Sequence, residues 1–402
     1  MTLRKVIFWC HLTAGVTGGV VIFIMSFTGV ILTFEPQISA YTERHERWVI
    51  PPGLDAKRLS LDVLLAKVRQ ANPNARPASM TVWSDPMASV LVNFSPQDSV
   101  FVNPYTGELL GHTSPVHKAM RVIVDWHRSL GSQEIGRPIT NACNLAFFVL
   151  AVTGVYLWWP RSWSWRALKP SLFFNPGLRG KARYWNWHNV IGFWSSSVLA
   201  TLTLTAVVMS YPWANDLLYT LTGTLPPPRP VVLAPAGNER TPSPSEKTRS
   251  NKPAASLDLL LARAERQAPG WLFMMMRFPP RPDGPVTVSI QEPEAPHPFA
   301  RSQLTLDRAT GEAVKWEPYT SLVLGRRLRS WVRALHTGEA FGVGGQSVAG
   351  LASLGGCFLV WTGLAMAWRR FRSWGREPAC VAVDAPPTTE PALQDGLRWV
   401  PK

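Results

Sequence analysis

The chain has 402 residues, a formal net charge of +15 at pH 7 and a mean hydropathy near zero. The mean hides four apolar runs, at residues 11–33, 139–159, 189–211 and 346–368. Each can cross a bilayer core of ~30 Å, which needs about 20 helical residues. The charge is concentrated beside these runs, which excludes a nucleic-acid partner and predicts a membrane protein in contact with lipid.

The first apolar run belongs to a predicted membrane helix at residues 7–34, preceded by Arg4 and Lys5. Its length exceeds the ~7–15 residues of a secretory signal core, and no small-x-small cleavage site follows it. We therefore expect this helix to remain as an anchor.

Basic residues set the expected orientation of the chain in the membrane. The connecting loop at residues 161–187 is rich in Arg and Lys and holds no Asp or Glu, and Arg369 and Arg370 close the last run. The positive-inside rule then places this loop and both termini in the cytoplasm. Residues 34–138 and 212–345 are expected outside. The four cysteines fall in spans or on the cytoplasmic side, so no disulfide framework is expected: they are Cys10, Cys143, Cys357 and Cys380.

Two outer domains are predicted, at residues 35–115 and 256–320. In each, a serine precedes an apolar-periodic helix (Ser60 and Ser256), as an N-cap residue does. Alternating segments predict strands near 80–83 and 90–94 in the first domain, and near 273–278 and 286–290 in the second. Each domain then has an Asx-x-x-Thr-Gly-Glu turn, at 103–108 and 307–312. We interpret residues 212–255 as a Pro-rich linker and residues 370–402 as a disordered cytoplasmic tail.

Between each outer domain and the next span lies a predicted interfacial helix and turn, at residues 116–137 and 321–344. The spans that follow are expected at 138–160 and 345–369, and the third span at 188–211. His127 and His336 lie in these interfacial segments, and each is followed nine residues later by a glycine and then by a Thr-Gly pair at the same offset.

The other two spans repeat each other in the same way. His11 and His188 head stripes of small residues at identical spacing. A stripe of small residues alone is typical of helix packing, but the two matching histidines are not explained by packing. The pattern predicts a duplicated two-helix unit, with His11 and His188 paired at the cytoplasmic face and His127 and His336 paired at the outer face.

Paired neutral imidazoles at helix ends suit a metal, and two alone suit a haem iron with both axial positions filled. Zinc would need further Cys or carboxylate ligands, which the surrounding sequence does not supply. The alternative is that these are interfacial histidines hydrogen-bonded to lipid headgroups. That interpretation suits a single histidine better than two symmetric pairs. Arginines surround the outer pair, among them Arg128 and Arg333, and could hold haem propionates, an anionic ferric chelate or headgroup phosphates.

The arrangement resembles the PepSY-associated transmembrane family from Arg4 to about Arg372. The resemblance rests on four segments: Trp126-His127-Arg128-Ser129-Leu130, Thr153-Gly154 with Trp159-Pro160-Arg161, Asn186-Trp187-His188 with Gly192, and Leu335-His336-Thr337-Gly338-Glu339. It implies an α-helical protein of the Gram-negative inner membrane with two α+β PepSY-like periplasmic domains. It also implies a di-haem b-type cytochrome that reduces ferric siderophore iron, with two haem b ligated by His11, His127, His188 and His336.

An electron donor, either a quinol or another reductase, would be needed, and iron-uptake membrane proteins are potential partners. No Gly-x-Gly-x-x-Gly segment follows a strand, so no nicotinamide or flavin site is expected. Because iron takes up one electron without group transfer, we expect no catalytic acid or base. Two other functions stay open: a PepSY-bearing protein that binds or regulates a periplasmic protease or assembly partner without redox chemistry, and a permease.

Overall fold

The computed structural model describes residues 2–53, 55–160, 162–227, 254–279, 281 and 284–373. Some sequence predictions fall on other residues and lie outside this description. They are Arg161, most of the predicted linker (228–253), Cys380 and the tail from residue 374.

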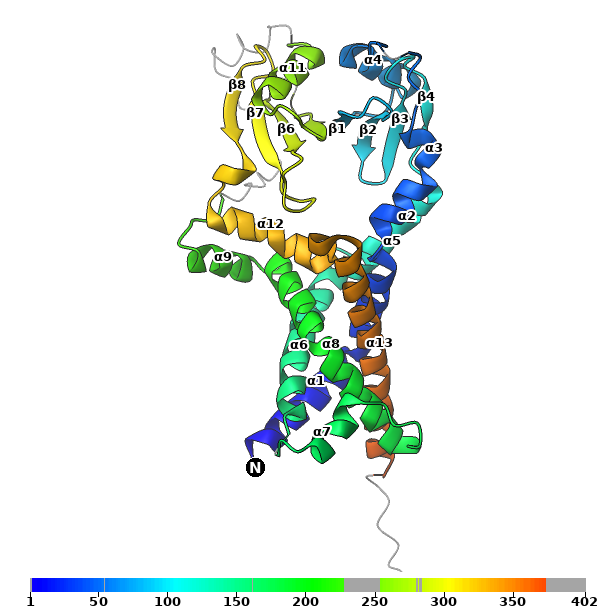
Figure 1. The fold of residues 1–402 in the computed structure, drawn as a ribbon, viewed down its shortest axis with the longest axis vertical. Coiled ribbons are helices and arrows are strands. Elements are labelled where there is room, and N and C mark those ends of the chain that lie inside the picture. Colours follow the sequence, from blue (N-terminus) through cyan, green and yellow to red (C-terminus); the bar gives the residue numbers. More distant parts are fainter. Residues whose placement is uncertain are drawn as a thin grey trace, which may run out of the picture.

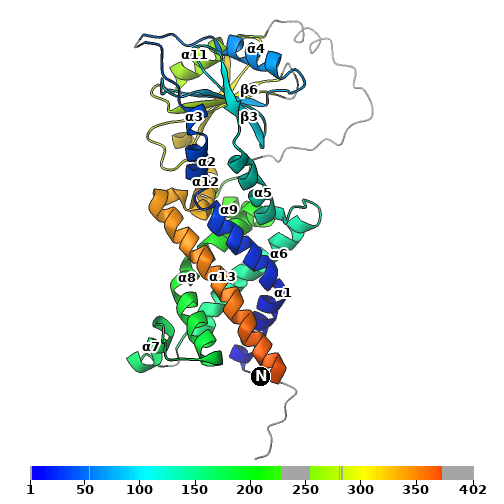
Figure 2. The same cartoon turned by 90° about the vertical axis from the view of Figure 1, so that its right-hand side faces the viewer.

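Four long helices form a bundle at one end of the molecule (Figures 1 and 2): α1 (Leu3–Leu32), α6 (Gly136–Trp158), α8 (Gly180–Ser210) and α13 (Gly342–Ser373). Both α1 and α8 pack against α6 and α13. Within the described residues these are the four helices long and apolar enough to cross a membrane. The chain is therefore a multi-pass membrane protein, as the hydropathy pattern predicts.

Small residues allow the bundle helices to approach one another closely. A methyl group on Gly356 of α13 would lie 2.9 Å from the Ser26 hydroxyl of α1, and one on Gly355 would lie 3.4 Å from the Ser195 hydroxyl of α8. Part of each small-residue stripe is therefore explained by helix packing.

Two amphipathic helices lie between the bundle and the outer part of the molecule: α5 (Pro115–Ser129), which packs on α1, and α12 (Leu324–Thr337), which packs on α8. The chain turns tightly from each into the next span. A methyl group on Gly136 would collide with the Ser129 carbonyl, and one on Gly345 with the Gly338 carbonyl. The glycine nine residues after each outer histidine is thus required by this turn.

The outer part is one antiparallel sheet, with strands in the order β4-β3-β2-β1-β5-β6-β7-β8. Its first half comprises β1 (Ser79–Trp83), β2 (Val90–Ser95), β3 (Asp98–Val102) and β4 (Leu109–His112). Its second half comprises β5 (Phe273–Arg277), β6 (Val286–Gln291), β7 (Ser302–Leu306) and β8 (Ala313–Glu317). The two outer segments that the sequence separates are joined here by pairing of β1 with β5, from Ser79↔Arg277 to Trp83↔Phe273.

Two helices, α4 (Leu61–Ala71) and α11 (Leu257–Gln267), cover the face of the sheet away from the bundle (Figure 1). Alternate strand residues bury an apolar core beneath them, including Met80, Val92 and Met274. Ser60 and Ser256 cap these helices as predicted. Each helix also caps the other: Asp62 Oδ2 accepts from Leu257 N at 2.7 Å, and Asp258 Oδ1 accepts from Leu61 N at 3.0 Å.

Several shorter helices are absent from the sequence prediction: α2 (Glu35–Thr42), α3 (Arg44–Arg47), α7 (Trp165–Leu172), α9 (Pro212–Leu221), η1 (Tyr319–Ser321) and η2 (Glu339–Phe341). The interpretation of residues 212–255 as linker is wrong at its start, where α9 packs against α8 and α12. Likewise α8 begins at Gly180, inside the predicted loop, because its first turns are polar and basic and hydropathy does not detect them.

Candidate functional site

The four histidines gather as two pairs. His127 lies near the end of α5 and His336 near the end of α12, and their rings are 6.3 Å apart between centroids with a 54° interplanar angle. His11 in α1 and His188 in α8 interact electrostatically with each other at the far end of the bundle. All four are half-buried. Burial, and then His336, lower the pKa of His127 to about 4, so that ring is neutral at pH 7.

A threonine on a neighbouring helix holds the Nδ1 atom of every one of these rings. The Nδ1–Oγ1 distances are 2.9 Å for three pairs and 3.2 Å for the fourth, in the order His11–Thr153, His127–Thr28, His188–Thr362 and His336–Thr205. The histidine and its threonine are always on different helices, so each contact also ties two helices together.

The threonines determine the tautomer of the rings. Each threonine hydroxyl donates its hydrogen at 2.7 Å to the carbonyl four residues earlier in its own helix: Ile24, Val149, Thr201 and Phe358. A hydroxyl has one hydrogen, so its oxygen must accept the hydrogen of Nδ1. His336 Nδ1 is also 2.9 Å from the Leu202 carbonyl, which can only accept. Every ring therefore carries its proton on Nδ1 and leaves Nε2 as a free lone pair, the form that ligates a metal.

Three of the four rings also lie against a glycine that follows the threonine. A methyl group on Gly29, Gly154 or Gly363 would lie 3.5–3.6 Å from the Cε1 atom of His127, His11 or His188, respectively. The fourth threonine, Thr205, is followed by Ala206. The repeated Thr-Gly pair is thus one device, in which threonine orients the ring and glycine lets it lie close to the helix.

The donor set fits a metal held between two imidazoles. A metal–nitrogen bond of about 2 Å, with each ring nitrogen about 1 Å from its centroid, puts the two centroids about 6 Å apart. The 6.3 Å between His127 and His336 agrees with this. No group of three or more His, Cys, Asp or Glu side chains that could hold a metal ion occurs within the described ranges. The pairs thus suit a centre whose other ligands come from a macrocycle, as in haem with two axial histidines.

Arginines adjoin the outer pair. Burial, more than any neighbouring charge, lowers the pKa of Arg333, which lies on the same helix as His336. The Arg333 guanidinium also interacts electrostatically with two arginines of α5 and with two carboxylates: Arg121, Arg128, Glu35 and Glu339. The Nε atom of Arg121 is buried without a hydrogen-bond partner in the part of the chain that the structure describes. A buried donor without a partner is costly, and an anionic group placed between these arginines would satisfy it.

The sequence prediction brings together the same histidines that the structure brings together, and it places Arg128 and Arg333 beside the outer pair. It notes Thr153 and Thr362 as a repeat but assigns no threonine the role of orienting a histidine, and it does not single out Thr28 or Thr205. Thr28-Gly29 in α1 repeats the Thr153-Gly154 dipeptide, and that repetition is the signal that could have found it. The other histidines stand apart: His112 beside Asp98, His117 beside Glu43, His297 in the β6–β7 connection and His45 in α3.

No curated protein matches the sequence. Residues 8–370 match the model of the PepSY-associated TM region, so the chain belongs to this family.

Proposed function

We propose that the protein is a di-haem b-type electron-transfer protein of a Gram-negative inner membrane, which reduces ferric siderophore iron in the periplasm and releases Fe(II). The observation that carries the proposal is the set of four histidines whose Nδ1 atoms are occupied by hydrogen bonds, while their Nε2 atoms make no hydrogen bond to the residues that the structure describes. Electron transfer across a bilayer core of ~30 Å requires two redox centres, because one haem cannot span that distance. Two such histidine pairs, at opposite ends of a membrane bundle, would provide the two sites.

The proposed orientation places both termini in the cytoplasm and the sheet in the periplasm. Around the end of the bundle away from the sheet, the described residues 162–187 and 369–373 are basic and contain no Asp or Glu. This distribution supports the orientation through the positive-inside rule. We further propose that the chain is a duplicated unit whose halves each carry a PepSY domain, since both halves have a serine-capped helix and four antiparallel strands.

When bound, haem supplies one-electron redox chemistry between Fe(II) and Fe(III). The chain's own residues hold this group and orient it. The four histidines would hold the haem iron through Nε2, with the threonines fixing the orientation of the rings. Arg121, Arg128 and Arg333 would attract haem propionates or an anionic chelate. One electron converts one chelated Fe(III) to Fe(II), and no proton or leaving group has to move through a side chain. The electron comes from a donor outside this chain, a quinol or a reduced protein.

An absorption spectrum of the purified protein tests the proposal most directly. Dithionite should produce the sharp α and β bands of six-coordinate b-type haem, with two haems per chain. In vesicles of one orientation, a chromogenic Fe(II) chelator should report iron reduction that requires His336. A protein without haem bands would instead favour the non-redox PepSY protein that binds a protease or assembly partner.

A further inference from the structure

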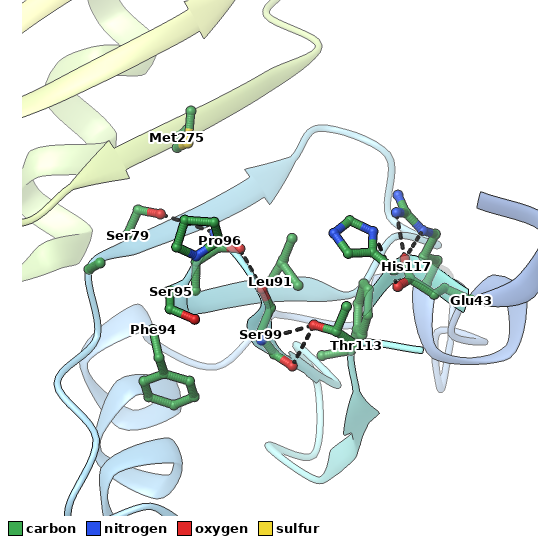
Figure 3. A pocket seen from close by; sticks show the side chains of 14 residues that line it. Glu43, Ser79, Leu91, Phe94, Ser95, Pro96, Ser99, Thr113, His117 and Met275 are labelled. Atoms are coloured by element: carbon green, nitrogen blue, oxygen red, sulfur yellow. Dashed lines mark hydrogen bonds and ion pairs between the residues drawn. The ribbon is translucent and has the colours of Figure 1, made fainter. Parts of the chain in front are cut away.

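A cavity of about 380 Å³ lies beneath the first half of the sheet, on the face turned away from α4 and α11 (Figure 3). Strands β1, β2 and β3 supply Ser79, Asn93 and Ser99 to its wall, and Met275 of β5 closes one end. The strand residues between these point into the apolar core on the other face. The cavity is separate from the histidine pairs, which belong to the helices below it.

One end of the cavity carries a buried ionic group. The Glu43 side chain is 2% exposed, and its Oε2 accepts from Arg47 Nη2 at 2.7 Å and from Arg47 Nε at 3.2 Å. Its Oε1 accepts from Ser114 N at 3.1 Å. His117 Nδ1 is 3.8 Å from the same oxygen and is buried without a hydrogen-bond partner among the described residues. Arg47 balances the carboxylate, and the His117 side chain lines the cavity beside this pair.

The other end is rich in hydrogen-bond donors. Asn93 Nδ2 donates to Ser79 Oγ at 3.0 Å, and Ser99 Oγ donates to Asn93 Oδ1 at 2.7 Å. These contacts use the amide oxygen and one amide hydrogen, leaving the second amide hydrogen and the Ser79 hydroxyl hydrogen for a ligand. Leu91 and Phe101 provide an apolar surface between the two ends.

The second half of the sheet fills this position with its own chain. Only Pro96 and Gln97 connect β2 to β3, whereas residues 292–301 connect β6 to β7. That longer connection folds against the sheet and the helix below. Arg301 lies 4.9 Å over the Phe273 ring, and His297, 4% exposed, contacts Tyr319 and Ser330. The asymmetry leaves the space open in the first half alone.

We propose that this cavity binds an elongated, oxygen-rich arm of an organic iron chelate, so that the chelate is held above the outer histidine pair. The inference rests on the proposed function and adds to it the place and chemistry of substrate binding. Donors at the strand end suit carbonyl or hydroxamate oxygens, and the apolar middle suits a methylene chain. The His117 end adjoins α5, whose His127 lies ten positions further along, about 15 Å at 1.5 Å per residue.

Binding of a redox-inert chelate separates this inference from reduction. The probe is the gallium(III) complex of a linear trihydroxamate, titrated calorimetrically into the full chain in nanodiscs. Ser95 lines the cavity and is exposed, so Ser95→Trp should fill it and weaken binding at least tenfold. Gln97→Trp, at the tip of the same turn and outside the cavity, is the matched control and should bind as the parent does. Ser79→Ala, a smaller change, should weaken binding several-fold.

The outcomes distinguish the two proposals. Weaker gallium-chelate binding in Ser95→Trp and Ser79→Ala, with parental binding in Gln97→Trp, supports the cavity, whatever the haem content. Parental affinity in Ser95→Trp, or no binding by the parent, overturns it. Absence of haem bands with intact chelate binding would instead overturn the redox function and leave the cavity standing.

Discussion

The two halves of the molecule present their outer histidines in the same way but join the sheet to the histidine-bearing helix differently. In the first half the joint is ionic: the buried Glu43 carboxylate forms an ion pair with Arg47 and accepts a hydrogen bond from the Ser114 N–H at the start of α5. In the second half an ion pair between Glu317 of β8 and Arg326 of α12 lies at the edge of the joint. The buried contact there is neutral, because His297 lies between the sheet, Tyr319 and Ser330 of α12. The ends of α5 and α12 are thus alike in both halves, because each presents one histidine of the pair. The contacts that join these helices to the sheet differ between the halves.

The hydrogen bonds of His297 define its charge state. Its Nδ1 accepts from Phe299 N at 3.2 Å, so the ring proton is on Nε2. Ser330 Oγ donates to the Arg327 carbonyl at 2.6 Å and therefore accepts from His297. The ring edge also meets Trp331 at 4.7 Å between centroids. A second proton on this ring would face a backbone N–H, so the joint depends on the neutral form.

Removal of the inner histidines should have the largest effect and tests whether each half contributes one ligand to a shared haem. His11→Ala and His188→Ala should each halve the haem content per protein, measured as the pyridine haemochrome. The double variant should lose no more than either single one if both histidines ligate the same iron, as proposed. Independent losses that add to a haem-free protein would break the pairing of the halves.

Loss of a threonine should have a smaller effect of the same kind in either half. Thr362→Val and Thr153→Val keep the shape but remove the oxygen that accepts from His Nδ1. Loss of the hydrogen-bond partner of a metal-ligating histidine typically costs about 10–100-fold in metal affinity, so haem should dissociate correspondingly faster to an apo-globin acceptor. Thr362→Ser keeps the hydroxyl and serves as the control. Equal haem retention in the Val and Ser variants would contradict the orienting role.

The two joints should respond unequally to removal of their polar groups. Glu43→Gln leaves the Arg47 charge without its counter-ion. Since Arg47 is 31% exposed, that charge can turn partly to water, so we expect a loss of about 2 kcal/mol. His297→Gln removes hydrogen bonds between neutral groups, for about 1 kcal/mol. Hydrogen exchange should increase chiefly in α5 for the first variant and in α12 for the second. Increases spread over both helices in either variant would show that the joints are not separate.

Acid should weaken the second joint, by the smallest amount of the effects expected here. Burial lowers the pKa of His297 below its ordinary value of 6.5. The unfolded chain then binds the proton more readily than the folded one, so stability falls as pH decreases below about 6.5 and levels off below the folded pKa. Exchange in residues 292–301 and α12 should rise over this range in the parent and stay flat in His297→Gln. A parental pH dependence in the variant would assign it to another group.

The sequence predicts the parts of the fold that are set locally. Apolar runs locate the four spans, and Ser60 and Ser256 mark the helices they cap, because both signals are contained within a few turns of chain. The family and the membrane class are confirmed. Hydropathy does not predict helix α9, because Pro212 and the polar residues of this helix directly follow the apolar run. On hydropathy alone, such residues indicate the end of a helix.

Tertiary relations account for most of what the sequence leaves out. The residues around Ser79 and Arg277 do not indicate that their strands pair, because the two strands are far apart in the chain. The threonine that orients each histidine lies on another helix, so its role appears only once the bundle is assembled. Haem ligation itself stays a prediction, because spacing identifies paired imidazoles without identifying what they hold.

The β1–β5 pairing makes the molecule a closed frame. The bundle fixes the lower ends of the two halves, the shared sheet fixes their upper ends, and α5 and α12 form the sides between them (Figure 1). Neither side can swing outward like a lid unless strands slide past each other or a span tilts. The frame therefore sets the spacing of the outer imidazoles in the protein alone. A redox centre of the kind proposed between them would then need little reorganisation energy when its charge changes.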